Sequence, residues 1–169
     1  TIPTTVQAQY CSYSPCSGYR YGISFEIDDV TDNLDGTATV CVKITNYSWR
    51  DLVYAAIELP SGVSAISPSH NSSFQGNKNY TVYNTSSYPF HSLKYVSNGS
   101  GIDNGESETF CSDINAADIF AMNDMWIAAK AGYYTRYINL DISECLEASI
   151  GNRVWDDVNK NGLQDSGEP

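Results

Sequence analysis

The sequence predicts an all-β protein, an antiparallel Ig-like β-sandwich with an EF-hand-like calcium loop at the C-terminus. Three observations support this fold class. Short segments of alternating apolar and polar residues recur between turns rich in Gly, Asn, Pro and Ser. The regular helical crossovers that a βαβ fold would need are missing. Finally, a run of oxygen-bearing side chains near the C-terminus matches a calcium-loop pattern. We therefore divide the chain into an extended N-terminal arm (1–20), a sandwich (21–147) and a calcium-binding segment (148–169).

The composition indicates a folded, acidic domain. A chain of 169 residues with 41% hydrophobic residues is long enough to bury one substantial core. Twenty acidic and nine basic residues give a net charge of −11. This balance argues against a nucleic-acid partner, which requires a basic surface, and against docking on anionic lipid. No apolar run approaches the length of a membrane span, so we expect no direct membrane insertion. Thr1 is consistent with a mature N-terminus left after signal-peptide cleavage.

The cysteines indicate an oxidising compartment. They show no C-x2-C pair and are accompanied by only two histidines, which favours disulfides over zinc. An odd count leaves one thiol free or bonded to another chain, and the pairing is open. Cys41, Cys111 and Cys145 each alternate out of phase with the apolar residues around them. We therefore expect these three on outer sheet faces, where they would clamp loops, strands or the arm. The expected disulfide cysteines are Cys11, Cys16, Cys41, Cys111 and Cys145.

The N-terminal arm is rich in Thr, Ser, Tyr and Pro and precedes the first alternating segment. We expect it to lie along its own sheet, and pairing with a neighbouring subunit is the alternative.

The clearest strand is Thr37–Thr45, in which alternate apolar residues line one face. An acidic turn, Asp28–Gly36, precedes it, and Asn115–Met125 is expected to contain a short helix. The remaining expected strands are Tyr21–Ile27, Asp51–Leu59, Ser92–Val96, Ser107–Ile114, Met125–Ala131 and Tyr133–Cys145.

The C-terminal segment fits the pattern D-x-[DN]-x-[DN]-G-x5-E, with Gly162 at the bend. Calcium takes six to eight oxygen ligands, and alternate residues of a curled loop point their oxygens inward. The alternative is an Asn/Gly/Asp-rich turn that binds nothing. The expected calcium ligands are Asp157, Asn159, Asn161, the carbonyl of Leu163, Asp165 and Glu168.

The same segment resembles the opening of the B-like domain of serine-aspartate-repeat bacterial surface proteins, relatives of collagen-adhesin B-type stalk modules. The resemblance rests on Ile150–Asn152, Val154–Asp157, Asn159–Gly162, Gln164–Asp165 and Gly167–Pro169. It implies a calcium-binding β-sandwich that stacks into stalks on cell surfaces. The run Gly36–Asn46, with Leu52 and Leu59–Val63, also resembles bacterial surface repeat sandwiches.

Sequons and aromatic residues suggest contact with sugars. Five N-x-[ST] sequons predict N-glycosylation if the source has the machinery, with Ser, Thr or Tyr O-linked glycans as the alternative. They are Asn46, Asn71, Asn79, Asn84 and Asn98. Thirteen tyrosines and three tryptophans could form a glycan-binding surface, although strands favour aromatic residues in any case. The candidate tyrosines are Tyr80, Tyr83, Tyr88, Tyr133, Tyr134 and Tyr137.

The sequence therefore favours a structural or adhesive unit of an extracellular surface protein or filament. Its expected partners are copies of itself or neighbouring domains of the same surface protein, with glycans as a further candidate. A carbohydrate-binding module of a secreted multidomain protein is the alternative. No nucleophile motif accompanies the histidines, and the carboxylates are too numerous for any pair to stand out, so we do not expect an enzyme.

Overall fold

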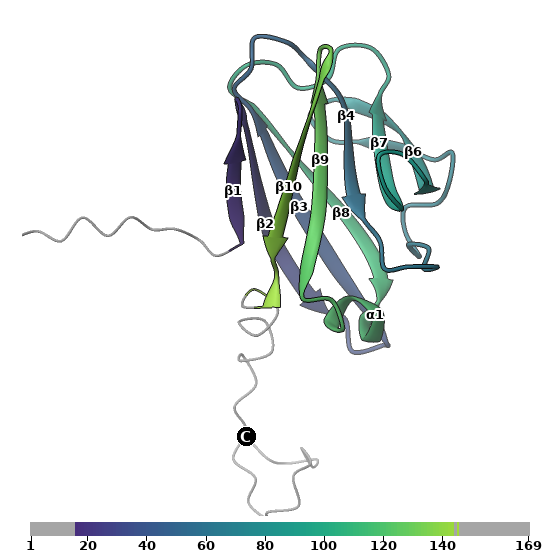
Figure 1. The fold of residues 1–169 in the computed structure, drawn as a ribbon. Helices are drawn as coiled ribbons and strands as arrows, with labels where there is room; N and C mark the ends of the chain where they lie inside the picture. The colour runs from purple at the N-terminus through teal and green to yellow at the C-terminus, as the bar shows by residue number, and fades with distance from the viewer. Residues whose placement is uncertain (1–15, 144, 146–169) are drawn as a thin grey trace, which may run out of the picture.

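A computed structural model describes residues 16–143 and 145, which form a β-sandwich of two antiparallel sheets (Figure 1). This confirms the predicted all-β class. The elements are β1 (Ser17–Arg20), β2 (Ile23–Asp32), β3 (Thr37–Asn46), β4 (Leu52–Glu58), β5 (Ser73–Gln75), β6 (Asn79–Ser86), β7 (Ser92–Ser97), β8 (Glu106–Asn115), α1 (Ala116–Phe120), β9 (Asp124–Ala131) and β10 (Tyr134–Asp141).

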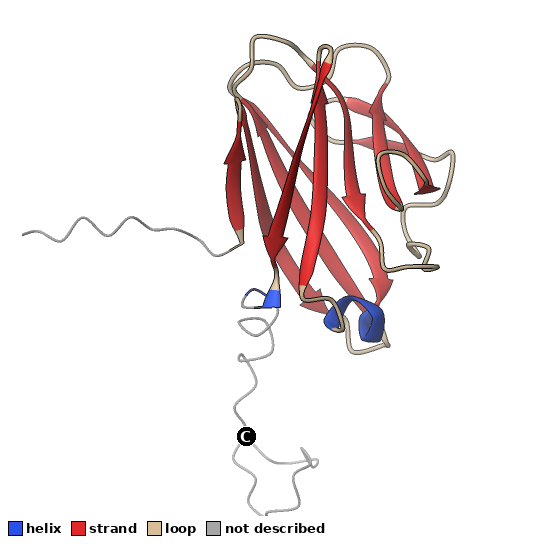
Figure 2. Cartoon of the chain, viewed as in Figure 1, coloured by secondary structure: helices blue, strands red, loops and turns tan. Residues whose placement is uncertain are grey.

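The two sheets divide the chain unevenly. One sheet has four strands in the order β1-β2-β3-β8, and the other has six in the order β10-β9-β4-β7-β6-β5. Figure 2 shows the strands as two layers, with loops gathered at both ends of the sandwich. The edge strands β1 and β10 meet where the two sheets come together. Their contact is close, because a Cβ on Gly18 of β1 would collide with the side chain of Ile138.

Alternation along the strands builds the core. In β3, Ala38, Val40, Val42 and Ile44 face inward and are buried, as the sequence predicts. Four aromatic rings, those of Phe74, Tyr80, Tyr95 and Phe110, pack against one another at the centre, with the Tyr95 and Phe110 centroids 4.6 Å apart. Packed rings of this kind contribute area burial and favourable edge contacts together.

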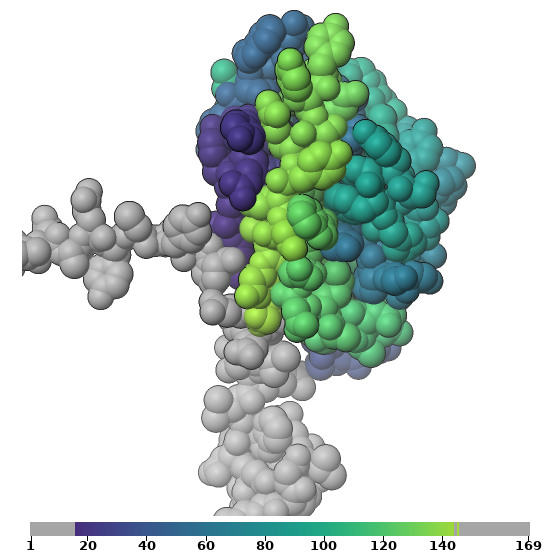
Figure 3. Space-filling view, in the orientation of Figure 1, coloured from purple at the N-terminus to yellow at the C-terminus, as the bar shows by residue number. Residues whose placement is uncertain are grey.

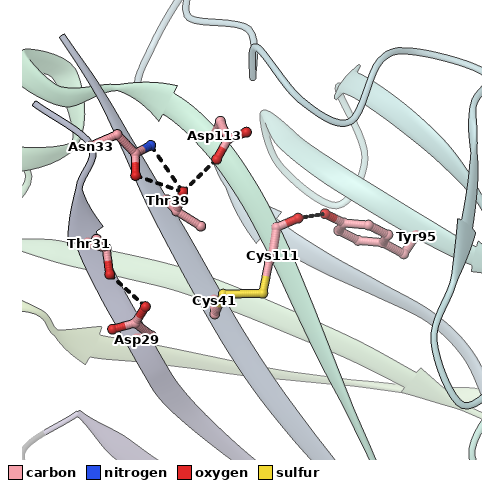
Figure 4. The surroundings of a disulfide bond; sticks show 8 residues. All are labelled: Asp29, Thr31, Asn33, Thr39, Cys41, Tyr95, Cys111 and Asp113. Carbon is pink, nitrogen blue, oxygen red and sulfur yellow. Dashed lines mark hydrogen bonds between the residues drawn. A yellow bond between two sulfur atoms is a disulfide. The ribbon is translucent and has the colours of Figure 1, made fainter. Parts of the chain in front are cut away.

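The first disulfide joins Cys41 of β3 to Cys111 of β8, which are directly opposite in the register of the sheet (Figure 4). The neighbouring residue Val42 and its partner Phe110 point into the core. The disulfide therefore lies on the outer face of the four-stranded sheet, which confirms the prediction for these two cysteines. From the other sheet, the Tyr95 hydroxyl donates to the Cys111 carbonyl at 3.2 Å. Burial raises the pKa of that hydroxyl above its usual value, so it remains a donor.

The second disulfide joins Cys16, just before β1, to Cys145, just after β10. Here the prediction of an outer-face position for Cys145 is wrong. The strand ends at Asp141, whose carboxylate accepts hydrogen bonds from the backbone N–H and the hydroxyl of Ser143. The resulting turn breaks the two-residue alternation, so Cys145 packs against the end of the core beside the buried Cys16.

Several boundaries differ from the expected ones. Ser17–Arg20, part of the expected arm, forms β1 and pairs with β2, so this part of the arm lies along its own sheet. The expected acidic turn is wrong over Asp28–Asp32, because β2 continues through a bulge after Ile27 and the turn is confined to 33–36. Strands β5 and β6 were not expected. The expected arm residues 1–15, including Cys11, and the calcium segment from residue 148 onward lie outside the described residues.

Candidate functional site

Three connections meet at one end of the sandwich, shown uppermost in Figure 1. They are the β1–β2 turn at Tyr21-Gly22, the β9–β10 turn at Gly132-Tyr133 and the β3–β4 connection at 47–51. Together with Asn104, from the connection before β8, they surround a cleft of about 490 Å³. A volume of this size lies within the roughly 300–1,000 Å³ typical of small-molecule sites.

Both hairpin turns have two residues, and each carries one tyrosine. Tyr21 and Gly22 have φ values of 44° and 89°, and two positive φ values in succession define the type I′ turn that suits a twisted hairpin. In the second turn the first residue, Gly132, carries the positive φ of 58°. Tyr21 and Tyr133 lie at the tips of these turns and are 79% and 85% exposed.

The β3–β4 connection is held by the buried side chain of Asn46. Its Nδ2 donates to the carbonyls of Arg50, at 2.7 Å, and Ile102, at 2.9 Å. Its Oδ1 accepts from the backbone N–H and the hydroxyl of Ser48. All the amide's hydrogen-bonding capacity is thus spent on shaping this connection, which displays Tyr47 and Trp49 beside the cleft.

The lining of the cleft is aromatic and cationic. Trp49 is 77% exposed, and the guanidinium carbon of Arg50 lies 4.0 Å from the centre of its ring. Arg136 lies 5.0 Å from the Tyr21 ring centre and 5.2 Å from that of Tyr134. The complete described lining is Tyr21, Gly22, Tyr47, Ser48, Trp49, Arg50, Asn104, Ala131, Tyr133, Tyr134 and Arg136, and it contains no carboxylate.

A shallower hollow lies next to the cleft, lined by Arg20, Tyr21, Thr135, Arg136 and Tyr137. The space-filling view in Figure 3 shows β9 and β10 running the length of one face, with β1 beside β10. The two hollows therefore share Tyr21 and Arg136 at the end of the β1–β10 seam.

The cleft and the Cys16–Cys145 disulfide lie at opposite ends of the sandwich. Strand β1 begins beside Cys16 and ends at the Tyr21 turn, whereas β10 begins beside Tyr133 and ends before Cys145. The two strands thus connect the disulfide end to the cleft end and run in opposite directions (Figure 1). The chain enters and leaves the sandwich at one end and exposes the cleft at the other.

The structure separates the tyrosines that the sequence grouped together. Tyr133 and Tyr134 line the cleft, and Tyr137 lies in the adjoining hollow. Tyr80 is wrong as a binding candidate, because it points inward from β6 and is fully buried among the core aromatics. Tyr83 and Tyr88 are exposed but do not line the cleft. Tyr21, Tyr47 and Trp49 also line the cleft and are not among the candidate residues named from the sequence. Tyr21 is the one with a local signal, because Gly22 follows it in a tight turn.

The sequons differ in accessibility. Asn46 is fully buried, and Asn84, at 8% exposed, donates from Nδ2 to the carbonyls of Ala65 and Pro68. A glycan on either nitrogen would remove one of these hydrogen bonds and find no space in the folded domain, so the structure argues against both predicted sites. The exposed sequon residues are Asn71, Asn79 and Asn98.

Within residues 16–143 and 145, no group of three or more His, Cys, Asp or Glu side chains converges to hold a metal ion. The same part of the chain has no helix long and apolar enough to cross a membrane.

Comparison with known proteins gives a short, partial match. Colossin-B of Dictyostelium discoideum is 48% identical to this chain over 40 residues, which cover 24% of the chain and 1% of Colossin-B. The chain thus spans about 1% of the length of that relative. No family model and no solved structure matches the chain.

Proposed function

We propose that this chain is an extracellular structural or adhesive unit, tethered at one end of its sandwich and presenting the aromatic cleft at the other. The observation that carries this proposal is the Cys16–Cys145 disulfide, which joins the start and the end of the described chain at a Cα–Cα distance of 6.0 Å. Disulfides persist in oxidising compartments, and two of them in a domain of this size fit a secreted protein.

The disulfide also determines how the unit carries load. A pull between the segments before Cys16 and after Cys145 passes through the bond and not through the strands, because the bond closes the path between them. The strands of the sandwich therefore bear none of the tension that is applied along the chain. Neighbouring domains of the same surface protein, or further copies of this chain, would transmit the tension on either side of the disulfide.

Calcium is part of the proposal at residues 151–169, which the sequence pattern alone supports. The ion would neutralise the carboxylates of Asp157, Asp165 and Glu168 and stiffen the junction next to the disulfide. Limited proteolysis with and without a chelator tests this, and Asp157→Asn/Glu168→Gln serves as the matched variant. Equal cleavage of residues 151–169 in all four samples would remove calcium from the proposal.

Protease shaving of intact source cells tests the location. On non-reducing gels we expect a resistant fragment containing residues 16–145, with Cys16 and Cys145 linked in its peptide map. Recovery of the protein only from lysed cells, with its cysteines reduced, would overturn the proposal.

A carbohydrate-binding module is the second candidate function. It is favoured by the exposed rings of Tyr21, Trp49 and Tyr133 around one cleft, because aromatic faces stack on sugar rings. It does not compete with the first proposal, since an adhesive unit needs a ligand. A glycan array that retains no sugar on the wild-type protein would count against it.

A further inference from the structure

We propose that the cleft binds an anionic sugar, a pyranose that carries a carboxylate or sulfate group, with its ring stacked on an exposed aromatic face and its anion held by Arg136 and Arg50. This inference rests on the proposed adhesive function and specifies the ligand class of its cleft.

The distribution of charge supports an anionic ligand. Between residues 16 and 145 the sequence contains three arginines, Arg20, Arg50 and Arg136, and all three line the cleft or the adjoining hollow. The chain as a whole has 20 acidic and nine basic residues, so this end differs sharply in composition from the rest. Asp51 and Asp103 are neighbours of the lining in sequence, but neither lines the cleft. Positive groups gathered in a concave site raise the local concentration of anions.

The guanidinium groups are available to a ligand. Among the described residues, the ion pairs join Lys43 to Glu26 and Lys78 to Glu106, and neither Arg50 nor Arg136 has a carboxylate partner. Each is instead positioned by an aromatic face. Stacking occupies the flat face of a guanidinium and leaves its N–H edge free, and that edge matches the two oxygens of a carboxylate or sulfate.

The aromatic rings provide the second half of the recognition. Trp49, Tyr133 and Tyr134 are exposed in the lining of the cleft, which also contains Ser48 and Asn104. Rings bind the apolar face of a pyranose, and hydroxyl and amide groups match its hydroxyls. A neutral sugar would leave both arginines unused. A proline-rich peptide would need the rings but not the charge, so the anionic sugar accounts for more of the lining.

Calorimetric titration of the full oxidised chain tests the proposal. The probes are a galacturonate trisaccharide, its methyl ester and a sulfated galactan trisaccharide, with a proline-rich peptide as the competing class. We expect binding of at least one anionic sugar, at least tenfold weaker binding of the ester than of the acid, and weakening by added salt. The free acid and the sulfated probe together show which anion the cleft prefers.

The variants locate the site. Arg136→Met, which keeps most of the apolar stem, and Trp49→Ala should each weaken binding at least tenfold. Lys94→Met and Trp126→Ala are the matched controls, because Lys94 lies over Tyr54 and Trp126 is an exposed residue of β9, both outside the cleft. They should bind like wild type. Melting temperatures establish that all four variants are folded.

Equal affinity for the acid and its ester, binding of the peptide alone, or no binding of any probe would each overturn the proposal. None of these results would alter the disulfide linkage or the location of the protein on the cell. The proposed extracellular structural or adhesive function is tested separately, by the protease-shaving experiment.

Discussion

The mechanical role of the Cys16–Cys145 disulfide gives the sharpest prediction. We expect the oxidised protein, held at residues 1 and 169, to show no unfolding step from the sandwich under tension, because the bond carries the load past residues 17–144. Replacing both cysteines by serine, in a Cys11→Ser background that prevents new pairing, should place the sandwich in the path of the force.

The length of the resulting step follows from the connectivity. The separation between the two cysteines is 129 residues, and the Cys41–Cys111 disulfide keeps 70 of these closed, which leaves 59 residue steps. At roughly 3.5 Å for each residue, full extension releases about 200 Å. Removing Cys41–Cys111 as well should lengthen the release to about 450 Å, since all 129 residues then extend.

Single-molecule force extension measures both lengths. Cys11→Ser alone is the control, and it should extend only through the segments outside the disulfide. A step near 200 Å in this oxidised control would refute the reasoning, because it would mean that the bond does not close the load path. Adding a reductant to the control should then produce the long step, which confirms that the instrument detects unfolding of this domain.

Three further predictions concern the folded domain. Expressed in a host that glycosylates sequons, the protein should carry N-glycans only at the exposed positions Asn71, Asn79 and Asn98. Peptide mapping that finds a glycan on Asn46 or Asn84 would contradict the hydrogen bonding described for these two side chains. Converting Cys41 and Cys111 to alanine should lower the free energy of unfolding by about 2–4 kcal/mol, because the unfolded chain gains conformational entropy when the cross-link is removed. An unchanged midpoint in denaturant titration would contradict this. The Ser143 hydroxyl and N–H hold the pKa of Asp141 below its usual value, so this carboxylate stabilises the fold above its ordinary pKa and the contribution is lost as pH falls through the lowered one. Ser143→Ala should raise the pKa of Asp141 in an NMR titration and leave the pKa of Asp35, the control carboxyl, unchanged.

The strands that could be predicted from the sequence are those in which apolar residues alternate with polar ones. The predicted strand Thr37–Thr45 matches β3, Thr37–Asn46, within one residue because its inward positions before Asn46 are all aliphatic. Strand β6 escaped prediction because one of its inward positions is Asn84, and its outward positions include Thr and Tyr. The inward amide is satisfied by the carbonyls of Ala65 and Pro68, which are distant in sequence. No local pattern reveals such partners.

The cleft was predictable only in part. Tyr133 and Tyr134 stand out as a pair after a glycine, and they do line it. The rings contributed by the other two connections come from positions more than 80 residues earlier. The pairing of β4 with β9 and the contact of β1 with β10 bring them to the same end. Binding sites built from several loops depend on this long-range topology, whereas the alternation of a strand does not.

The position of the disulfide and the construction of the cleft are connected by a mechanical argument. In a domain that bears load in series, the connections at both ends transmit force, and their conformations must resist it. Under the proposed arrangement the cleft end carries only the force of its own ligand, because the bond at the other end takes the rest. The connection that displays Trp49 can therefore rest on one buried amide, that of Asn46, with bonds to the backbone. If the cleft end did transmit the main load, replacing Asn46 by alanine would lower the unfolding force of the oxidised protein. We expect it to disturb the cleft and leave the oxidised force trace unchanged.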